Sequence, residues 1–113
     1  VVSDRRSDLI VTGGENVYPA EVERAIESCP GVREAAVVGI PDPEWGHVVA
    51  AVVVADINCL VLEAHCRKLL AGYKVPRKWF YASELPRTST GKISRRLARE
   101  WAEKADAAHR QSA

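Results

Sequence analysis

Two apolar runs near the middle of the chain constrain its fold more than any other feature. Residues 35–40 and 47–55 consist mostly of valine and alanine. The segment between them, Pro41-Asp42-Pro43-Glu44-Trp45-Gly46, is rich in the residue types that form turns. Apolar residues at successive positions of a strand mean that both of its faces are buried. The pattern therefore predicts two neighbouring strands that other elements cover on each face.

Apolar residues at helical spacing predict three covering helices. Pro19 suits the first turn of the first helix, and Pro30-Gly31 ends it. The expected apolar stripes are Val22, Ala25, Ile26 and Cys29 in the first helix, Leu62, Cys66, Leu69, Leu70 and Tyr73 in the second, and Ile93, Leu97 and Trp101 in the terminal helix.

Shorter signals complete the expected fold. Residues 9–18, with a double glycine at their centre, predict a small two-stranded hairpin, and Trp79-Phe80-Tyr81 predicts a short strand. We expect residues 106–113 to form a frayed tail because they are small and polar. The fold class predicted for residues 1–113 is thus a single α+β domain: a small three-stranded, mostly antiparallel sheet with flanking helices and an N-terminal two-stranded hairpin.

Length and composition favour a cytoplasmic domain. The 113 residues, 47% of them hydrophobic, suffice for one modest core, and they include no apolar run long enough to cross a bilayer. The first residues lack the order of a secretory signal. The chain contains no methionine, so we expect a fragment of a longer protein.

The cysteines and histidines predict no chemistry. Three cysteines without a CxxC pair argue against a disulfide framework, and Cys29 and Cys66 lie on expected apolar helix faces as structural thiols. His47, His65 and His109 lack the spacing of a zinc site. We therefore expect no metal site.

Positive charge is concentrated in one segment of a chain whose net charge is only +1. Between Arg67 and Arg99 there are ten basic residues and a single acid, Glu84. This segment could meet a polyanionic partner or form a solvated basic face. A non-catalytic basic module that binds nucleic acid is the alternative from another class. The segment has no interleaved exposed aromatics and no known reading motif, so we expect no nucleic-acid partner.

Two loops have the composition of binding sites. Thr88-Ser89-Thr90-Gly91-Lys92 combines hydroxyls, glycine and a cation, which suits a phosphate or a carboxylate. It is not a P-loop, because Pro86 and Ile93 stand where glycine and a hydroxyl residue are needed. On their own, this loop and Gly13-Gly14-Glu15-Asn16 are better explained as plain turns than as binding sites.

The order and spacing of several segments resemble one enzyme family. The segments are Asp4-Arg5-Arg6-Ser7-Asp8-Leu9-Ile10, Gly13-Gly14-Glu15-Asn16-Val17-Tyr18-Pro19-Ala20-Glu21-Val22-Glu23, Gly39-Ile40-Pro41-Asp42-Pro43-Glu44-Trp45-Gly46, Gly72-Tyr73-Lys74-Val75-Pro76-Arg77 and Pro86-Arg87-Thr88-Ser89-Thr90-Gly91-Lys92-Ile93-Ser94-Arg95. They are similar to closing motifs of the adenylate-forming superfamily, and the third and fourth match its acyl-CoA synthetase branch. The resemblance extends to about Arg99.

The resemblance implies a two-step ligase reaction. ATP, with magnesium, and a carboxylic acid, expected to be a fatty acid, give acyl-AMP and pyrophosphate, and the thiol of coenzyme A then displaces AMP. The small domain rotates between the steps. ATP and the acid are held mainly by a large N-terminal domain that these residues do not include, so the isolated domain is expected to be inactive.

The resemblance also implies roles for individual residues. Lys92 matches the lysine that meets the carboxylate and the α-phosphate during adenylation, and Arg5 matches an arginine directed toward the ribose. Ser7 occupies the hinge position, where Asp or Lys is usual. Positions expected to face coenzyme A are Gly13, Gly14, Glu15, Trp45, Lys74 and Arg77.

One alternative within the family remains open. An adenylation domain could instead load the phosphopantetheine arm of a carrier protein. The form of the second and fourth segments favours free coenzyme A. The residues that select the acid lie outside these 113 positions.

Overall fold

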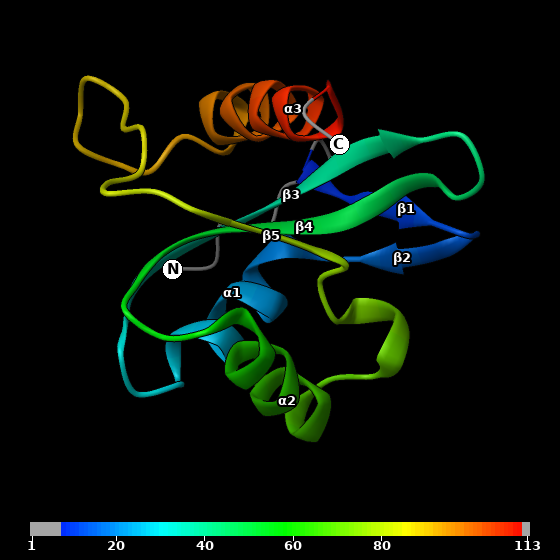
Figure 1. Cartoon of the computed structure of the whole chain (residues 1–113), viewed down its shortest axis with the longest axis horizontal. Helices are drawn as coiled ribbons and strands as arrows, with labels where there is room; N and C mark the ends of the chain where they lie inside the picture. The colour runs from blue at the N-terminus through cyan, green and yellow to red at the C-terminus, as the bar shows by residue number, and fades with distance from the viewer. Residues whose placement is uncertain (1–7, 112–113) are drawn as a thin grey trace.

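The computed structural model describes residues 8–111, and its elements follow the order expected from the sequence (Figure 1). They are β1 (Ile10–Thr12), β2 (Glu15–Val17), α1 (Pro19–Glu27), β3 (Val32–Asp42), β4 (Gly46–Ala55), α2 (Cys59–Leu69), the 3₁₀ turn η2 (Gly72–Lys74), β5 (Lys78–Tyr81) and α3 (Arg95–Gln111). None of the described helices is both long enough and apolar enough to span a membrane.

The sheet confirms the predicted α+β class. β1 and β2 form the antiparallel N-terminal hairpin, and β3, β4 and β5 form a second sheet in that order. β3 and β4 pair antiparallel along almost their whole length. β5 pairs parallel to β4, because α2 and η2 return the chain to the other end of the sheet before β5 begins.

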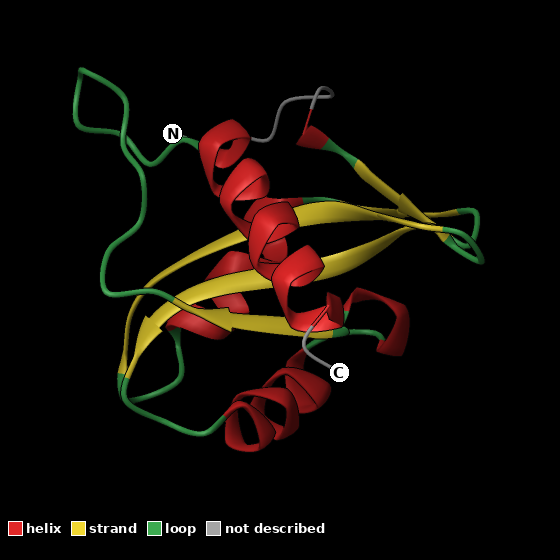
Figure 2. Ribbon diagram, turned by 45° about the horizontal axis from the view of Figure 1, so that its top comes forward, coloured by secondary structure: helices red, strands yellow, loops and turns green. Residues whose placement is uncertain are grey.

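Both faces of the central strands are covered, as the valine-rich runs predict. Side chains of a strand alternate between its two faces. Val37, Val49 and Val53 therefore join a core beneath α1 and α2, while Val38 and Val52 join a second core beneath α3. Figures 1 and 2 show α3 on one side of the sheet and the other two helices on the opposite side.

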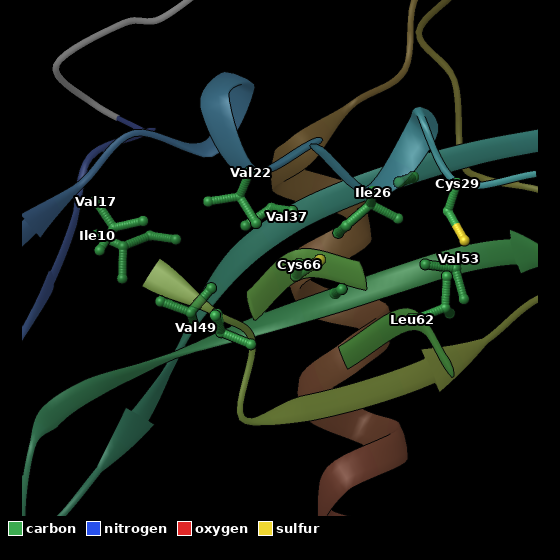
Figure 3. Close-up of a cluster of buried hydrophobic side chains, with 13 residues drawn as sticks. Ile10, Val17, Val22, Ile26, Cys29, Val37, Val49, Val53, Leu62 and Cys66 are labelled. Carbon is green, nitrogen blue, oxygen red and sulfur yellow. The ribbon is translucent and has the colours of Figure 1, made fainter. Parts of the chain in front are cut away.

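The core beneath α1 and α2 contains two of the three cysteines (Figure 3). Cys29 and Cys66 are buried as expected, among Ile26, Val53 and Leu62. Burial is the main cause that raises the pKa of Cys66 to about 11, so its thiol stays protonated at neutral pH. It is a packing residue.

Only part of the apolar stripe predicted for the second helix is buried. Leu62 and Cys66 are fully buried, but Leu69 is 56% exposed and Tyr73 is 41% exposed. The reason is that α2 ends at Leu69, and the extended cap residue Leu70 turns into the core in its place. Tyr73 belongs to the separate turn η2, where the helical period no longer applies.

The terminal helix packs through a different stripe from the one expected. The fully buried residues of α3 are Ala98 and Ala102, while Trp101 is 39% exposed. Small side chains allow the helix to approach the sheet closely, and the larger ones lie along its flanks. Ile93 precedes the helix altogether.

Within the segment expected to fray, residues 106–111 belong to α3. Asp106 is buried on the α3 face that meets the sheet, and its carboxylate accepts a 2.7 Å hydrogen bond from Lys78 of β5. This contact holds the later turns of α3 against the sheet, and the helix runs to Gln111.

Candidate functional site

The expected site residues within 8–111 fall at two opposite ends of the domain (Figures 1 and 2). The β1–β2 hairpin, with Gly13 and Gly14 at its tip, and the β3–β4 turn with Trp45 lie at one end. The loop that carries Lys92 projects from the other end. Arg5 and Ser7 lie outside the described residues.

The two hairpin glycines are required for different reasons. Both have positive φ, +56° at Gly13 and +83° at Gly14, which disfavours any residue with a Cβ atom. A Cβ atom at position 13 would also lie 2.6 Å from Cε3 of Trp45. At position 14 it would meet nothing within 4 Å. Gly13 makes room for Trp45, whereas Gly14 borders open space.

Trp45 is fixed from several sides while 36% of it stays exposed. Asp42 Oδ2 accepts hydrogen bonds from the backbone N–H groups of Glu44 and Trp45, at 3.0 and 2.9 Å. The Gly13 amide donates to the Trp45 carbonyl at 3.0 Å. The Arg77 guanidinium lies 4.4 Å from the centroid of the Trp45 ring, a cation–π contact. Gly13, Trp45 and Arg77 therefore form one contiguous group.

Lys74 and Glu15 do not join this group. Lys74 Nζ lies 2.9 and 3.1 Å from the two carboxylate oxygens of Glu21 on α1. The hydrogen bond to Glu21 is the main cause that raises the pKa of Lys74. The Glu21 carboxylate thus compensates the charge of Lys74. Glu15 is exposed in β2.

A substitution series separates the two roles of the hairpin glycines. We expect Gly13→Ala to lower the free energy of unfolding more than Gly14→Ala, measured by urea denaturation. Both carry the cost of positive φ, roughly 1–2 kcal/mol. Gly13→Ala must also displace the Trp45 ring, which adds about 1–3 kcal/mol. The difference between the two variants should vanish in a Trp45→Ala background. Equal losses of unfolding free energy in the presence of Trp45 would contradict the statement that Gly13 makes room for its ring.

The Lys92 loop is a tight hairpin closed by its own backbone. The Thr88 amide donates to the Lys92 carbonyl at 2.7 Å, and the Gly91 amide donates to the Thr88 carbonyl at 2.9 Å. Gly91 has a φ of +88°, as expected for a turn followed by a left-handed glycine in a three-residue hairpin loop. Lys92 directly follows this glycine. Its side chain is exposed and has no hydrogen-bond or ion-pair partner among residues 8–111.

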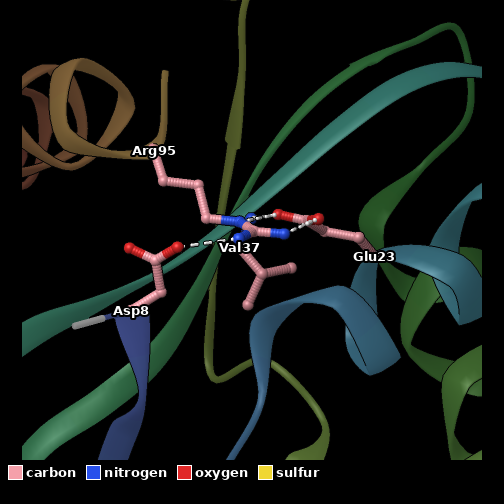
Figure 4. Close-up of polar contacts among 4 residues, drawn as sticks. All are labelled: Asp8, Glu23, Val37 and Arg95. Carbon is pink, nitrogen blue, oxygen red and sulfur yellow. Dashed lines mark hydrogen bonds and ion pairs between the residues drawn. The ribbon is translucent and has the colours of Figure 1, made fainter. Parts of the chain in front are cut away.

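Arg95, three residues after Lys92, anchors the start of α3 (Figure 4). Its guanidinium donates to both oxygens of Glu23, at 2.7 and 2.9 Å, and to Asp8 at 2.8 Å. Glu23 Oε2 also accepts the Val37 amide at 2.9 Å. The hydrogen bond to Glu23 is the main cause that raises the Arg95 pKa. The sequence motifs predicted no role for this network, although its charged members Asp8, Glu23 and Arg95 lie within them.

Most charges of the basic segment are paired with acids, several of which come from other parts of the sequence. Among the described residues, seven of its ten basic side chains form ion pairs. The pairs are Arg67–Glu63, Lys74–Glu21, Lys78–Asp106, Arg87–Glu34, Arg95–Glu23, Arg96–Glu100 and Arg99–Glu103. The structure therefore gives no support to a polyanion-binding face.

Comparison with known proteins reveals the family. The chain is 47% identical over 102 residues to the uncharacterized acyl-CoA ligase YhfT of Bacillus subtilis (strain 168), covering 90% of the chain and 21% of that protein. A fatty acyl CoA synthetase structure from Mycobacterium tuberculosis is 46% identical, with a TM-score of 0.87, and the match covers 90% of the chain and 21% of that structure. The o-succinylbenzoate CoA synthetase MenE of Bacillus subtilis, in complex with OSB-AMP, is 45% identical, with a TM-score of 0.81; the match covers 84% of the chain and 20% of that structure.

The chain thus spans about a fifth of the length of the relatives it matches. The sequence model of the AMP-binding enzyme C-terminal domain matches residues 21–92, which include most of α1, the three-stranded sheet and the loop up to Lys92. With this match and these identities, the chain belongs to the AMP-binding enzyme C-terminal domain family of adenylate-forming enzymes.

Proposed function

We propose that the chain is the mobile C-terminal domain of a cytoplasmic acyl-CoA synthetase and alternates between two orientations on a large N-terminal domain. In one orientation Lys92 meets the carboxylate and the α-phosphate during acyl-AMP formation. In the other, the end with Gly13, Gly14 and Trp45 meets coenzyme A.

One observation carries the proposal. The Lys92 loop and the Gly14 hairpin project from opposite ends of the domain (Figure 1). A single fixed orientation could not present both ends to the same bound acyl group. A rotating domain can present each in turn.

The local chemistry at each end fits its proposed step. An exposed ammonium without a partner among the described residues can offset charge that develops on a phosphate and a carboxylate. At the other end, the open space beside Gly14 fits the narrow pantetheine arm. Arg77 and the partly exposed Trp45 ring suit the phosphates and the adenine of coenzyme A.

The names of the relatives favour one acyl acceptor, but they do not favour one carboxylic acid substrate. Those compared above carry CoA ligase or CoA synthetase names, which favours coenzyme A over a carrier protein. The acids in their names include both fatty acids and o-succinylbenzoate. We propose a carboxylic acid as the substrate class, with a fatty acid as the first candidate to test.

The proposal predicts a sharp difference between the chain and the complete ligase. The 113-residue chain should show the circular dichroism of an α+β fold yet release no pyrophosphate from ATP and a panel of carboxylic acids, because we propose that the ATP pocket belongs to the large N-terminal domain. The full-length ligase should release pyrophosphate with at least one of the acids. ATP- and acid-dependent release by the purified chain alone would contradict the proposal.

A further inference from the structure

Arg87 lies at the base of the Lys92 loop, and its side chain donates hydrogen bonds in two directions. Nη1 donates to the carbonyl oxygen of Gly91 at 3.0 Å. Nη2 donates to Oε2 of Glu34 on β3, with which Arg87 forms an ion pair. Arg87 thus joins the residue directly before Lys92 to the sheet.

The loop needs such a link, because its backbone bonds determine only its internal shape. Those bonds all lie within residues 86–94: Thr88 to Lys92, Gly91 to Thr88, and Ser94 to Pro86. They would persist if the whole hairpin swung relative to the sheet. Residues 87–92 are all exposed, so packing adds little restraint at the tip. Leu85 and Ile93 pack into the core at the base of the loop, and the ion pair from Arg87 to Glu34 adds a side-chain link between the loop and β3.

The chemistry of the Arg87–Glu34 pair suits a link between the Lys92 loop and the sheet. The planar guanidinium has donors in a fixed fork, so one rigid group can hold two acceptors at a set separation. The Glu34 carboxylate also compensates the charge of Arg87. Lys92 is then the loop cation whose charge no described side chain compensates.

We propose that Arg87 is a positioning residue for Lys92 in the acyl-adenylate-forming step, and that it acts through its bonds to Glu34 and Gly91. The inference rests on the proposed function. It extends that function to a pair of residues that lie outside the reacting groups and control where the catalytic ammonium is held.

The test compares half-reactions of the full-length ligase in two backgrounds. Adenylation is measured by pyrophosphate release in a single turnover, and thioester formation is measured from supplied acyl-AMP. We expect Arg87→Ala to slow adenylation roughly 10-fold or more, since small displacements of a catalytic group are costly. Glu34→Gln should also slow adenylation. Arg87→Lys should show an adenylation rate between those of Arg87→Ala and the wild type. Thioester formation should be unchanged in all three variants.

The second background shows whether Arg87 acts through Lys92. In a Lys92→Ala enzyme, Arg87→Ala should cause no further loss of adenylation, because there is no ammonium left to position. A general loss of folding would slow both backgrounds alike. Arg67→Ala is the matched control: it removes an exposed arginine in an ion pair on α2, and it should leave both half-reactions at the wild-type rate.

The outcomes separate this inference from the function on which it rests. If Lys92→Ala slows adenylation but Arg87→Ala does not, or if Arg87→Ala costs the same factor in both backgrounds, the positioning role is overturned and the proposed function stands. If Lys92→Ala leaves adenylation unchanged, the proposed function fails, and the inference fails with it.

Discussion

Lys92→Ala in the full-length ligase should slow acyl-AMP formation by about 10²–10³-fold, the loss typical of one charge contact made in the transition state. Thioester formation from supplied acyl-AMP should continue at nearly the wild-type rate. The reason is that Lys92 lies at the end of the domain opposite the Gly14 hairpin. Rapid-quench measurement of the two half-reactions tests both statements.

The exposure of Lys92 makes this experiment easy to interpret. No hydrogen bond or ion pair with another described residue is lost on substitution, so the fold should be unaffected. Lys68→Ala, which removes another exposed lysine, on α2, is the matched control and should leave both steps unchanged. An equal loss in both half-reactions would show that Lys92 has no step-specific role, or that the domain does not alternate.

The reciprocal result is expected for Gly14→Leu. Thioester formation should fall by about 10-fold or more, because a branched side chain would enter the open space proposed for the pantetheine arm. Adenylation should survive, since the Lys92 loop lies at the other end of the domain. The half-reactions are those measured for Lys92→Ala, with thermal melts of every variant.

Gly14→Ala separates steric blocking from backbone strain. Both substitutions place a Cβ atom at a φ of +83° and share its cost, roughly 1–2 kcal/mol of stability. Only leucine extends far into the open space. If alanine and leucine slow thioester formation equally, backbone strain is the cause of the loss. A wild-type rate in a folded Gly14→Leu enzyme would show that the hairpin is only a turn.

Local sequence determined the elements and much of their burial. Runs of valine and alanine define β3 and β4 and require both faces to be covered, because alternate side chains of a strand point to opposite faces. The stripe of α1 and the left-handed glycines of the two hairpins are also local properties, since each depends on a few neighbouring residues. The family motifs add the identities of the candidate residues.

Tertiary packing determined which face of α3 is buried and how β5 pairs with the sheet. The sequence offers α3 two stripes with the same spacing, a large one through Leu97 and Trp101 and a small one through Ala98 and Ala102. The sheet surface beneath α3 selects the small one, because small side chains let the helix approach the sheet closely. The parallel pairing of β5 is likewise set by where α2 returns the chain.

The candidate site depends most on contacts that no local pattern contains. Arg95 meets Glu23 and Asp8 across 72 and 87 positions, and Arg87 meets Glu34 across 53. Each acid lies on a segment that reaches its partner only after the sheet and helices have docked. The sequence was therefore sufficient to identify Lys92 and Gly14 as candidate residues. Only the folded chain determines how their loops are held and that these loops project from opposite ends of the domain.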